Sequence, residues 1–428
     1  MTCHGQNIAL IDGNNFYVSC ERVFDPGLNR KPVVVLSNND GCAVARSNEV
    51  KALGVKMGEP WFRLKPLAQR HGIVGLSGNH ALYVDMSRRM MSLLAGFGAR
   101  QEVYSIDECF LDLGTGADVT ELGNNMRQEV ARCLGLPVGV GIASTKTLAK
   151  LANHLSKKRP EYNGVCNLNM VPEAELLPLL AGIDVGEVWG VGSRLAEGLR
   201  AVGIAHVLAL RQADPRWLRR RFSVVMERIG LELRGISCLQ LGEIAASNQQ
   251  IQSTRSFGKP VYDFDELAEA VLTFVRRAGQ RLRRQGSVAG ALHLFIRTSP
   301  FREGEPQYRQ GITLTLPTPT ADELQLANAA KRGLEAVYRT GYAYRRAGVL
   351  LLELENARTL ARNLFADPQA ERKSQALMTT LDAMRNRFGS DIIHVAGEGR
   401  QRRWSTRASN RSPCYTTRWA DLPTARAG

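Results

Sequence analysis

Two adjacent carboxylates, Asp107 and Glu108, stand in the middle of a stretch whose flanks alternate apolar and other residues as strands do. Neighbouring side chains of a regular strand point to opposite faces, so both acids can serve one site only if the backbone bends there. A tight hairpin with both acids at its tip would seat a hard divalent cation, which prefers oxygen ligands. An acidic turn exposed to water is the alternative, because Asp is common in turns.

A third carboxylate, Asp12, ends the short apolar run of residues 7–12, and Gly13 follows as a breaker. A buried strand that ends in an acid is a common way to build an active site, although an Asp that caps a helix is also common. The predicted order of elements up to residue 143 is strand, loop, strand, helix, hairpin, helix, strand. That order favours an α+β domain with an antiparallel-containing sheet.

Such a sheet would bring Asp12 beside the hairpin at residues 107–108, although about 95 residues separate them in the chain. Two divalent ions bridged by carboxylates are the arrangement that polymerases and nucleases use for in-line phosphoryl displacement. The sequence therefore predicts a metal site for phosphate chemistry where the three acids meet.

Two lysines are candidate phosphate contacts. Lys51 falls in a short predicted helix over residues 48–53, and Lys157 falls in the last turn of a helix that begins at Thr145. Cations in a last turn also suit the helix dipole, and a single Lys is usually a solvated charge, so both alternatives stay open.

Residues 188–204 read as two helices joined by Gly190-Val191-Gly192. Such a turn exposes backbone N–H groups at a helix N-terminus, where they can bind a DNA phosphate without reading sequence. A plain helical hairpin is the alternative. The nearby cluster Arg219-Arg220-Arg221 favours phosphate binding.

The composition supports a nucleic-acid partner. The 428 residues carry a formal net charge of +15, which suggests a polyanion, and the length predicts two or more domains. We see no secretory signal pattern and no transmembrane run, and the eight scattered cysteines fit neither a disulfide framework nor a zinc site. We therefore expect a cytoplasmic, nucleoid-associated protein without a membrane partner.

The second half of the chain divides into a linker, a module and a tail. The polar residues 248–259 predict an interdomain linker. Residues 261–355 then predict a compact module in which helix 266–284 is followed by strand 288–297, strand 310–316, helix 322–340 and strand 347–354. Beyond residue 356 the apolar periodicity falls and arginine rises, which predicts a partly ordered tail that docks partners and contains a helix over 374–388.

Several blocks of the chain together resemble the Y-family translesion DNA polymerases, and most of all their UmuC branch, the catalytic subunits of bacterial DNA polymerase V. The blocks are residues 12–21, 33–46, 104–108, 145–153, 189–192, 253–258, 298–301 and 412–418. The likeness runs essentially from end to end, and the joint occurrence of these blocks in order is highly specific.

The resemblance implies a right-hand polymerase that performs DNA-templated, two-metal nucleotidyl transfer in SOS-induced error-prone repair. It implies an α+β palm at 1–18 and 79–168, small fingers at 19–78, a helical thumb with a helix-hairpin-helix at 169–243, a linker at 244–259, an α/β little finger at 260–355 and a partner-docking tail at 356–428.

The resemblance also assigns roles to single residues. Asp12, Asp107 and Glu108 would hold two Mg²⁺ ions, for which Mn²⁺ can substitute, with the Gly13 carbonyl as a further ligand. Tyr17 matches the steric gate, whose ring fills the space that a ribose 2′-OH would need. The remaining matches are Lys51 and Lys157 for the nucleotide triphosphate and Gly190, Val191, Gly192, Arg194 and Arg255 for DNA.

The partners implied by the resemblance are primer–template DNA, dNTPs, a UmuD′-like dimer, a RecA filament and a sliding clamp. Two positions and one short peptide depart from the family. Asn48 replaces a common Tyr, Lys51 replaces an Arg and so loses a bidentate fork, and the clamp-binding peptide at 361–365 keeps only its final Leu-Phe.

Two other classes of function compete with a polymerase. A catalytically inactive DNA-binding accessory would have no need of the intact Asp12, Asp107 and Glu108. A nucleotidyl cyclase on the same palm would leave the helix–Gly–helix unit and the basic little finger unexplained.

Overall fold

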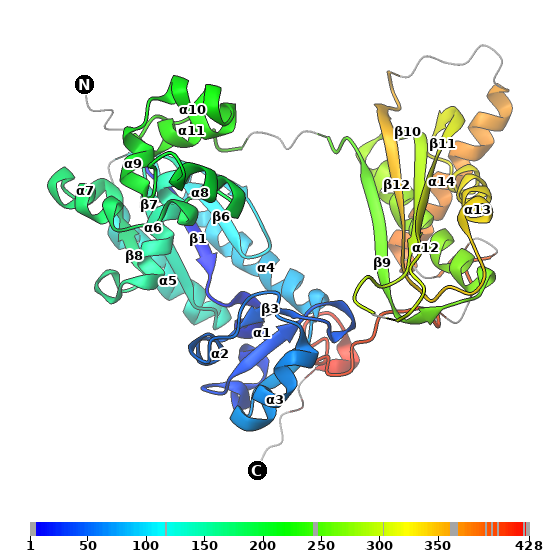
Figure 1. Ribbon diagram of the computed structural model, residues 1–428, viewed down its shortest axis with the longest axis horizontal. Coiled ribbons are helices and arrows are strands. Elements are labelled where there is room, and N and C mark those ends of the chain that lie inside the picture. Colours follow the sequence, from blue (N-terminus) through cyan, green and yellow to red (C-terminus); the bar gives the residue numbers. More distant parts are fainter. Residues whose placement is uncertain are drawn as a thin grey trace. The chain divides into compact units, whose positions relative to one another are not determined.

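The computed structural model describes residues 6–115, 118–242, 247–302, 304–359, 367–389, 392–394, 397–399, 402–422 and 424. The chain forms two compact units (Figure 1). Unit 1 comprises Met1–Ser37, Gly41–Ile244 and Asn410–Gly428, and unit 2 comprises Asn38–Asp40 and Ala245–Ser409.

The central sheet of unit 1 has five strands in the order β5-β6-β1-β7-β8. Their bounds are β1 Ile8–Gly13, β5 Arg100–Val103, β6 Glu108–Asp112, β7 Val138–Ala143 and β8 Val165–Asn167. β1 pairs antiparallel with β6 and β7, and only β7 and β8 pair in parallel. This sheet confirms the predicted α+β class with an antiparallel-containing sheet.

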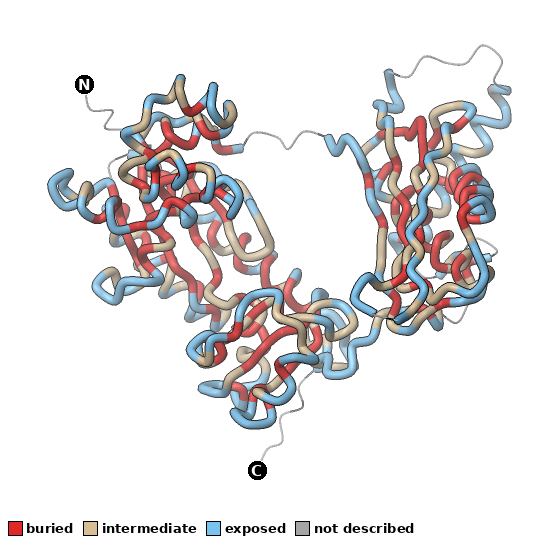
Figure 2. Tube along the Cα trace, in the orientation of Figure 1, coloured by how far each residue is buried: buried red, intermediate tan, exposed pale blue. Residues whose placement is uncertain are grey.

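The two faces of this sheet are covered by different helices, so β1 is buried on both sides (Figure 2). Its residues Ala9 and Ile11 pack in one core with α4 (His80–Leu94) and α5 (Val119–Leu134). Ile8 and Leu10 pack in another core with α6 (Lys146–Lys158). A strand that is apolar on both faces reads as a continuous hydrophobic run, which is the pattern seen in residues 8–11.

A second, three-stranded sheet of unit 1 has the order β3-β2-β4. Its strands are β2 Val33–Leu36, β3 Ala43–Arg46 and β4 Val74–Ser77. The helices nearby in sequence are α1 Phe16–Phe24, α2 Asn48–Ala52 and α3 Trp61–His71. α1 follows β1 directly, so the short stretch of residues 12–17 belongs to the junction between the two sheets.

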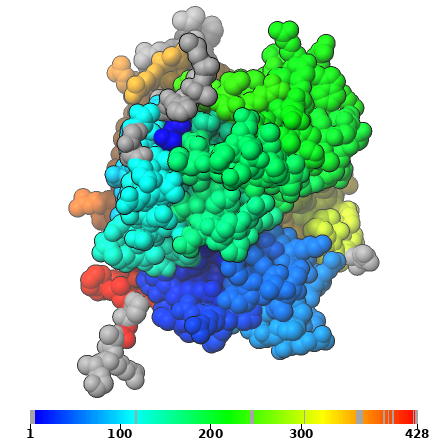
Figure 3. Space-filling view, turned by 90° about the vertical axis from the view of Figure 1, so that its left-hand side faces the viewer, coloured from blue at the N-terminus to red at the C-terminus, as the bar shows by residue number. Residues whose placement is uncertain are grey.

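Five short helices complete unit 1 and share the core of α6. They are α7 Glu173–Ala181, α8 Ser193–Arg200, α9 Val207–Gln212, α10 Pro215–Arg221 and α11 Val224–Leu233. In the space-filling view this helical part is green (Figure 3). The helical character expected for residues 169–243 is therefore found, and the helix predicted after residues 190–192 is present as α8.

Unit 2 is built on one antiparallel sheet in the order β11-β10-β12-β9, with α12 and α13 packed against it. The bounds are β9 Ile251–Val261, α12 Phe264–Gln285, β10 Ser287–Arg297, β11 Arg309–Thr320, α13 Glu323–Val337 and β12 Tyr344–Asn356. The predicted helix, strand, strand, helix and strand of this module are confirmed in type and order.

The predicted linker over residues 244–259 is wrong for most of its length, because Ile251–Val261 forms β9. Ile251, Ser253 and Phe257 are buried, whereas Gln252 and Ser256 are exposed. β9 pairs only with β12 within the sheet, so it is an edge strand, and its exposed residues lie on the face opposite its buried ones, as in an antiparallel sheet with one face against the core. This explains why its composition resembles that of a linker.

The described part of the tail is packed more extensively than a partly ordered segment would be. The predicted helix at 374–388 is present as α14 over Pro368–Phe388. Trp404 is 1% exposed and belongs to the core of unit 2, whereas residues 410–422 belong to unit 1. The clamp-peptide residues 361–365 lie outside the described residues.

Within the described ranges, no helix has both the length and the apolarity that spanning a membrane requires.

Candidate active site

Asp12 lies near the end of β1, directly opposite Glu108 of β6 on one side and Gly139 of β7 on the other. β5 and β6 form a hairpin in which the backbone amides of Tyr104 and Ser105 both donate to the Glu108 carbonyl at 3.1 Å. The predicted hairpin and its position beside Asp12 are therefore confirmed, even though the strands are far apart in the chain.

Ser105 shapes the tip of this hairpin. Its hydroxyl donates to Asp107 Oδ1 at 2.6 Å and accepts from the backbone amides of Asp107 and Glu108 at 3.2 and 3.1 Å. The Gly13 amide donates to the Asp107 carbonyl at 2.9 Å, which ties the tip to the end of β1. Asp107 thus lies in the turn and Glu108 begins the strand, so the chain bends between the two acids.

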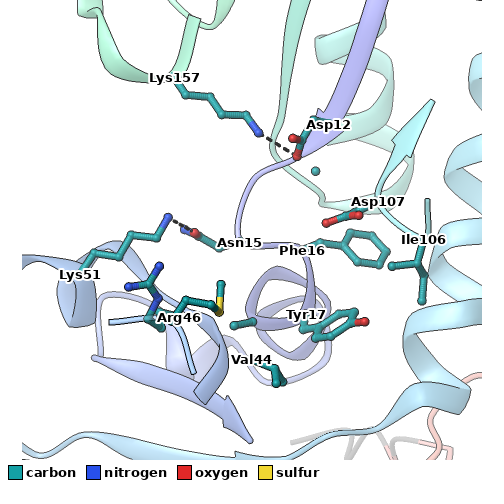
Figure 4. A pocket seen from close by; sticks show the side chains of 13 residues that line it. Asp12, Asn15, Phe16, Tyr17, Val44, Arg46, Lys51, Ile106, Asp107 and Lys157 are labelled. Carbon is teal, nitrogen blue, oxygen red and sulfur yellow. Dashed lines mark hydrogen bonds and ion pairs between the residues drawn. The ribbon is translucent and has the colours of Figure 1, made fainter. Parts of the chain in front are cut away.

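A cavity of about 320 Å³ lies where β1, the hairpin tip and the three-stranded sheet meet. Figure 4 shows the Asp12 and Asp107 carboxylates side by side at one end of it and Lys51 and Arg46 at the other. Six of the residues singled out in the sequence line it, namely Asp12, Gly13, Tyr17, Lys51, Asp107 and Lys157. The structure therefore brings one part of the predicted site together.

Glu108 is turned toward Lys150, whose Nζ lies 2.8 Å from Oε2 and 3.0 Å from Oε1. The same ammonium group lies 4.6 Å from the centroid of the Tyr104 ring and 5.4 Å from that of Trp189. Glu108 is not among the residues that line the cavity. Over the residues that the structure describes, no group of three or more His, Cys, Asp or Glu side chains is close enough to hold a metal.

Asp12 is held in an unusual electrostatic setting. Burial raises its pKa to about 7, and the nearby Glu108 carboxylate adds to the rise, while Lys157 acts in the opposite direction. The Lys157 Nζ lies 2.7 Å from Asp12 Oδ1. Lys157 and Lys150 therefore neutralise two of the three acids in this structure, and a hard cation with oxygen ligands fits the same carboxylates.

Tyr17 lies on the wall of the cavity with its ring stacked on Tyr83, with 4.3 Å between centroids and 13° between ring planes. The His80 ring lies edge-on to Tyr17 at 5.9 Å. Burial, with a smaller contribution from the Asp107 charge, raises the pKa of Tyr17. Its hydroxyl therefore remains neutral, and its ring is fixed as a flat wall.

Two residues that the sequence did not single out, Asn15 and Arg46, line the cavity near Lys51. Lys51 Nζ donates to Asn15 Oδ1 at 2.6 Å, and Asn15 has the left-handed φ of 50° between β1 and α1. Arg46 also lines the cavity and donates to the Val55 carbonyl at 2.6 Å. The signal for Asn15 was its place in the short turn between a strand and a helix, and the signal for Arg46 was its place as the last residue of a strand.

The predicted DNA-contact residues are not among those that line this cavity. Gly190, Gly192 and Arg194 are exposed before and within the first turn of α8. Val191 is buried, and its amide donates to the Val188 carbonyl at 2.9 Å, so this N–H serves the turn itself. Arg255 belongs to β9 in unit 2, where burial and the neighbouring charge of Arg402 lower its pKa.

Comparisons with known proteins place this geometry in a family. The impB/mucB/samB family model matches residues 11–154, and the model of its C-terminal domain matches residues 248–364. A further model, described as a domain of unknown function (DUF4113), matches residues 375–425.

Similar proteins extend over nearly the whole chain. Protein ImpB of Salmonella typhimurium is 43% identical over 98% of this chain and 100% of its own length. Protein UmuC of Salmonella typhimurium strain LT2 is 43% identical over 97% of this chain and 99% of its own length. DNA polymerase IV of Desulfatibacillum aliphaticivorans is 26% identical over 90% of this chain and 95% of its own length.

A solved structure has the same fold. It is the Y-family DNA polymerase chimera Dbh-Dpo4(243-245)-Dbh, with a TM-score of 0.62 and 21% identity, and the match covers 81% of this chain and 99% of the chimera. The predicted right-hand polymerase fold is confirmed by this likeness.

Proposed function

Because this chain belongs to the UmuC branch of the Y-family DNA polymerases, we propose that its cavity between Asp12 and Lys51 is the polymerase active site. The protein is a DNA-directed DNA polymerase of the translesion type that serves error-prone repair. Its substrates are DNA and deoxynucleoside triphosphates.

The observation that carries the assignment is the composition of one 320 Å³ cavity. The carboxylates of Asp12 in β1 and of Asp107 in the adjacent hairpin turn lie at one end, and Lys51 and Arg46 lie at the other. A nucleoside triphosphate bound along the cavity would place its β- and γ-phosphates toward the cations and its reacting α-phosphate toward the acids. Charge of both signs at the two ends of one cavity is what nucleotidyl transfer needs, because catalysis here is mostly positioning and neutralisation.

The family uses divalent metal ions, and we propose two Mg²⁺ ions, with Mn²⁺ as a substitute, at the carboxylates that Lys150 and Lys157 neutralise in this structure. Asp12, Asp107, the Gly13 carbonyl and Glu108 would hold them. When bound, such ions lower the pKa of the primer 3′-OH and stabilise charge on the transferred phosphoryl group. Lys150 and Lys157 would exchange their carboxylate partners for other anions as the site fills.

The cations would bind the rest of the nucleotide. Lys157 leaves Asp12 for the triphosphate, and Lys51 is held in place for it by Asn15, whose amide in turn donates to Asn48 Oδ1 at 3.0 Å. Tyr17 would fill the space of a ribose 2′-OH, because its ring forms a wall of the cavity against Tyr83.

The polymerase subdomains follow the units of structure in this proposal. The palm at 1–18 and 79–168 holds the five-stranded sheet, the fingers at 19–78 hold the three-stranded sheet, and the thumb at 169–243 holds α7 to α11. The little finger at 260–355 lies in unit 2, to which β9 is added.

We also propose the contacts beyond the active site. Gly190, Gly192 and Arg194 would bind a DNA phosphate at the first turn of α8, and Arg255 would bind DNA from the little finger. The likeness to UmuC supports a UmuD′-like dimer as a partner, and a RecA filament and a sliding clamp are further proposed partners. A DNA substrate further suggests a cytoplasmic, nucleoid-associated location.

Primer extension by the full-length chain tests the proposed function. We expect incorporation opposite both an undamaged and an abasic template with Mg²⁺ or Mn²⁺, and none with a chelator. The assay is run alone and with a UmuD′-like dimer and a RecA filament. An absence of incorporation in every combination, with DNA binding retained, would instead support the inactive DNA-binding accessory.

A further inference from the structure

Residues 410–422, which we call the strap, pack along the edge of the three-stranded sheet of unit 1. The Ser77 amide donates to the Asn410 carbonyl at 2.9 Å, and the Asn410 amide donates to Ser77 Oγ at 3.0 Å. Arg411 forms a parallel bridge with Ser77 next to the end of β4. In Figures 1 and 3 the red strap lies against the blue N-terminal part of unit 1. The strap thus covers an open sheet edge.

Asn79 holds the strap through side-chain hydrogen bonds. Its side chain is 1% exposed. The Nδ2 group donates to the carbonyl of Ser412 at 3.1 Å, to its hydroxyl at 2.9 Å and to the Pro413 carbonyl at 3.0 Å. Its Oδ1 accepts from the Leu82 amide at 3.4 Å in the first turn of α4. One buried side chain therefore caps α4 and holds the strap at the same time.

The Ser412 hydroxyl continues this network toward the active site. It donates to Glu21 Oε1 at 3.0 Å, and the Tyr83 hydroxyl donates to the same oxygen at 2.5 Å. Glu21 is 1% exposed and Tyr83 is fully buried. On the other side of Tyr83, its ring stacks on Tyr17 at 4.3 Å. A chain of direct contacts therefore leads from the strap to the wall of the cavity.

We propose that the strap positions Tyr17 and so sets the sugar selectivity of the polymerase, with Ser412 as the positioning residue. Ser412 fixes the Glu21 carboxylate, Glu21 fixes the Tyr83 hydroxyl, and the Tyr83 ring gives Tyr17 a rigid backing. This inference rests on the proposed function, because it takes Tyr17 as the residue that excludes a 2′-OH. It gives a role to the end of the region matched by the domain of unknown function.

The mechanism depends on rigidity, since a shift on the order of 1 Å can change a rate strongly when groups must meet closely. Without the Ser412 hydroxyl, Glu21 keeps one side-chain donor and can rotate with Tyr83. Tyr17 would then move away from the sugar and leave room for a ribose hydroxyl. Deoxynucleotides need no such room, so their incorporation does not depend on this contact.

The strap stays seated when this one hydroxyl is removed. The hydrogen bonds of Asn410 to Ser77 remain, and Asn79 still donates to two backbone carbonyls of the strap. The Tyr415 ring also stacks on Phe24, with 4.9 Å between centroids and 8° between planes. The variant Ser412→Ala therefore separates positioning from general stability.

The test compares full-length Ser412→Ala, Tyr17→Ala and the wild type in primer extension with one template base. The readout is the ratio of kcat/KM for the dNTP to kcat/KM for the matching rNTP. We expect Ser412→Ala to lower this ratio about three- to tenfold, the effect of losing one ordinary hydrogen bond, with dNTP kcat/KM within about twofold. Trp419→Ala is the control, because Trp419 is in the strap and 89% exposed; its ratio should not change.

Amide hydrogen exchange of residues 74–79 is measured on the same proteins and should be equal in Ser412→Ala and the wild type. If Tyr17→Ala lowers the ratio and Ser412→Ala does not, the role of the strap is overturned and the polymerase assignment stands. If Tyr17→Ala leaves the ratio unchanged, the gate assignment fails and the inference fails with it. If Ser412→Ala lost kcat/KM equally for the dNTP and the rNTP and also lost exchange protection at residues 74–79, the strap would be merely structural. That result would also overturn the inference.

Discussion

Replacement of Arg385 by Ala should strongly destabilise unit 2. Arg385 on α14 and Glu323 at the start of α13 form a bidentate ion pair, with Nη1 to Oε2 at 2.6 Å and Nη2 to Oε1 at 2.9 Å. Their side chains are 0% and 1% exposed. This pair joins α14 of the tail to α13 of unit 2.

The magnitude follows from burial. Removing one partner of a buried pair leaves the other charge without compensation and costs about 3–5 kcal/mol. That is a large share of the roughly 5–15 kcal/mol that stabilises a typical domain. Arg283 remains within 3.4 Å of Glu323 Oε2 and offsets part of the loss, so we expect about 3 kcal/mol, at the low end of the range.

Amide hydrogen exchange in the full chain is the assay, because two units need not unfold in one transition. The opening free energy of α13 should fall by about 3 kcal/mol in Arg385→Ala. Arg372→Ala on the same helix is the control, since Arg372 is exposed, and it should change the value by less than about 0.5 kcal/mol.

A double variant sharpens the test. Glu323→Leu combined with Arg385→Met removes both charges and should recover most of the lost stability, because apolar residues often replace a buried pair without cost. The reasoning would be refuted if Arg385→Ala behaved like Arg372→Ala, or if the double variant were no more stable than Arg385→Ala.

Two further predictions concern unit 1. In Gly141→Ala the new Cβ would lie 2.1 Å from the Asn153 backbone nitrogen, so denaturant unfolding should show a loss of at least about 1–3 kcal/mol, whereas Gly96→Ala has nothing within 4 Å and serves as the control. Burial raises the pKa of Glu21 above its ordinary value of 4.5, so the folded state favours the protonated acid. The contribution of Glu21 to the free energy of unfolding is complete below pH 4.5 and is lost as the pH rises through the raised pKa. Relative to Glu21→Gln, the wild type should therefore lose stability between about pH 5 and about pH 8. An equal difference in the free energy of unfolding between the two proteins at about pH 5 and at about pH 8 would contradict this.

Much of the architecture could be predicted because apolar periodicity records burial directly. The module at 261–355 was predicted in type and order, with α13 at Glu323–Val337 where 322–340 was expected. The hairpin beside Asp12 could also be predicted, since an α+β sheet leaves few places for a short acidic hairpin. Both inferences use residues that are near in sequence or share one sheet.

The failures have a common physical cause, which is that contacts between distant segments leave little local pattern. β9 was predicted as a linker because its exposed polar residues lie on the face of an edge strand that is turned away from the core. The pairing of Glu108 with Lys150 depends on where α6 crosses the sheet. The strap reaches Glu21 and Asn79 from more than 330 residues away, and no periodicity in residues 410–422 indicates that contact.

The most direct test of the polymerase site is the variant Asp107→Ala in metal-dependent primer extension. Asp107 lines the cavity beside Asp12 and is positioned by Ser105, so its loss should abolish incorporation while DNA binding and folding are retained. Glu121→Ala, an exposed acid on α5, should extend primers at the wild-type rate. Extension by Asp107→Ala at a rate close to that of Glu121→Ala would contradict the assignment of this cavity as the site of nucleotidyl transfer.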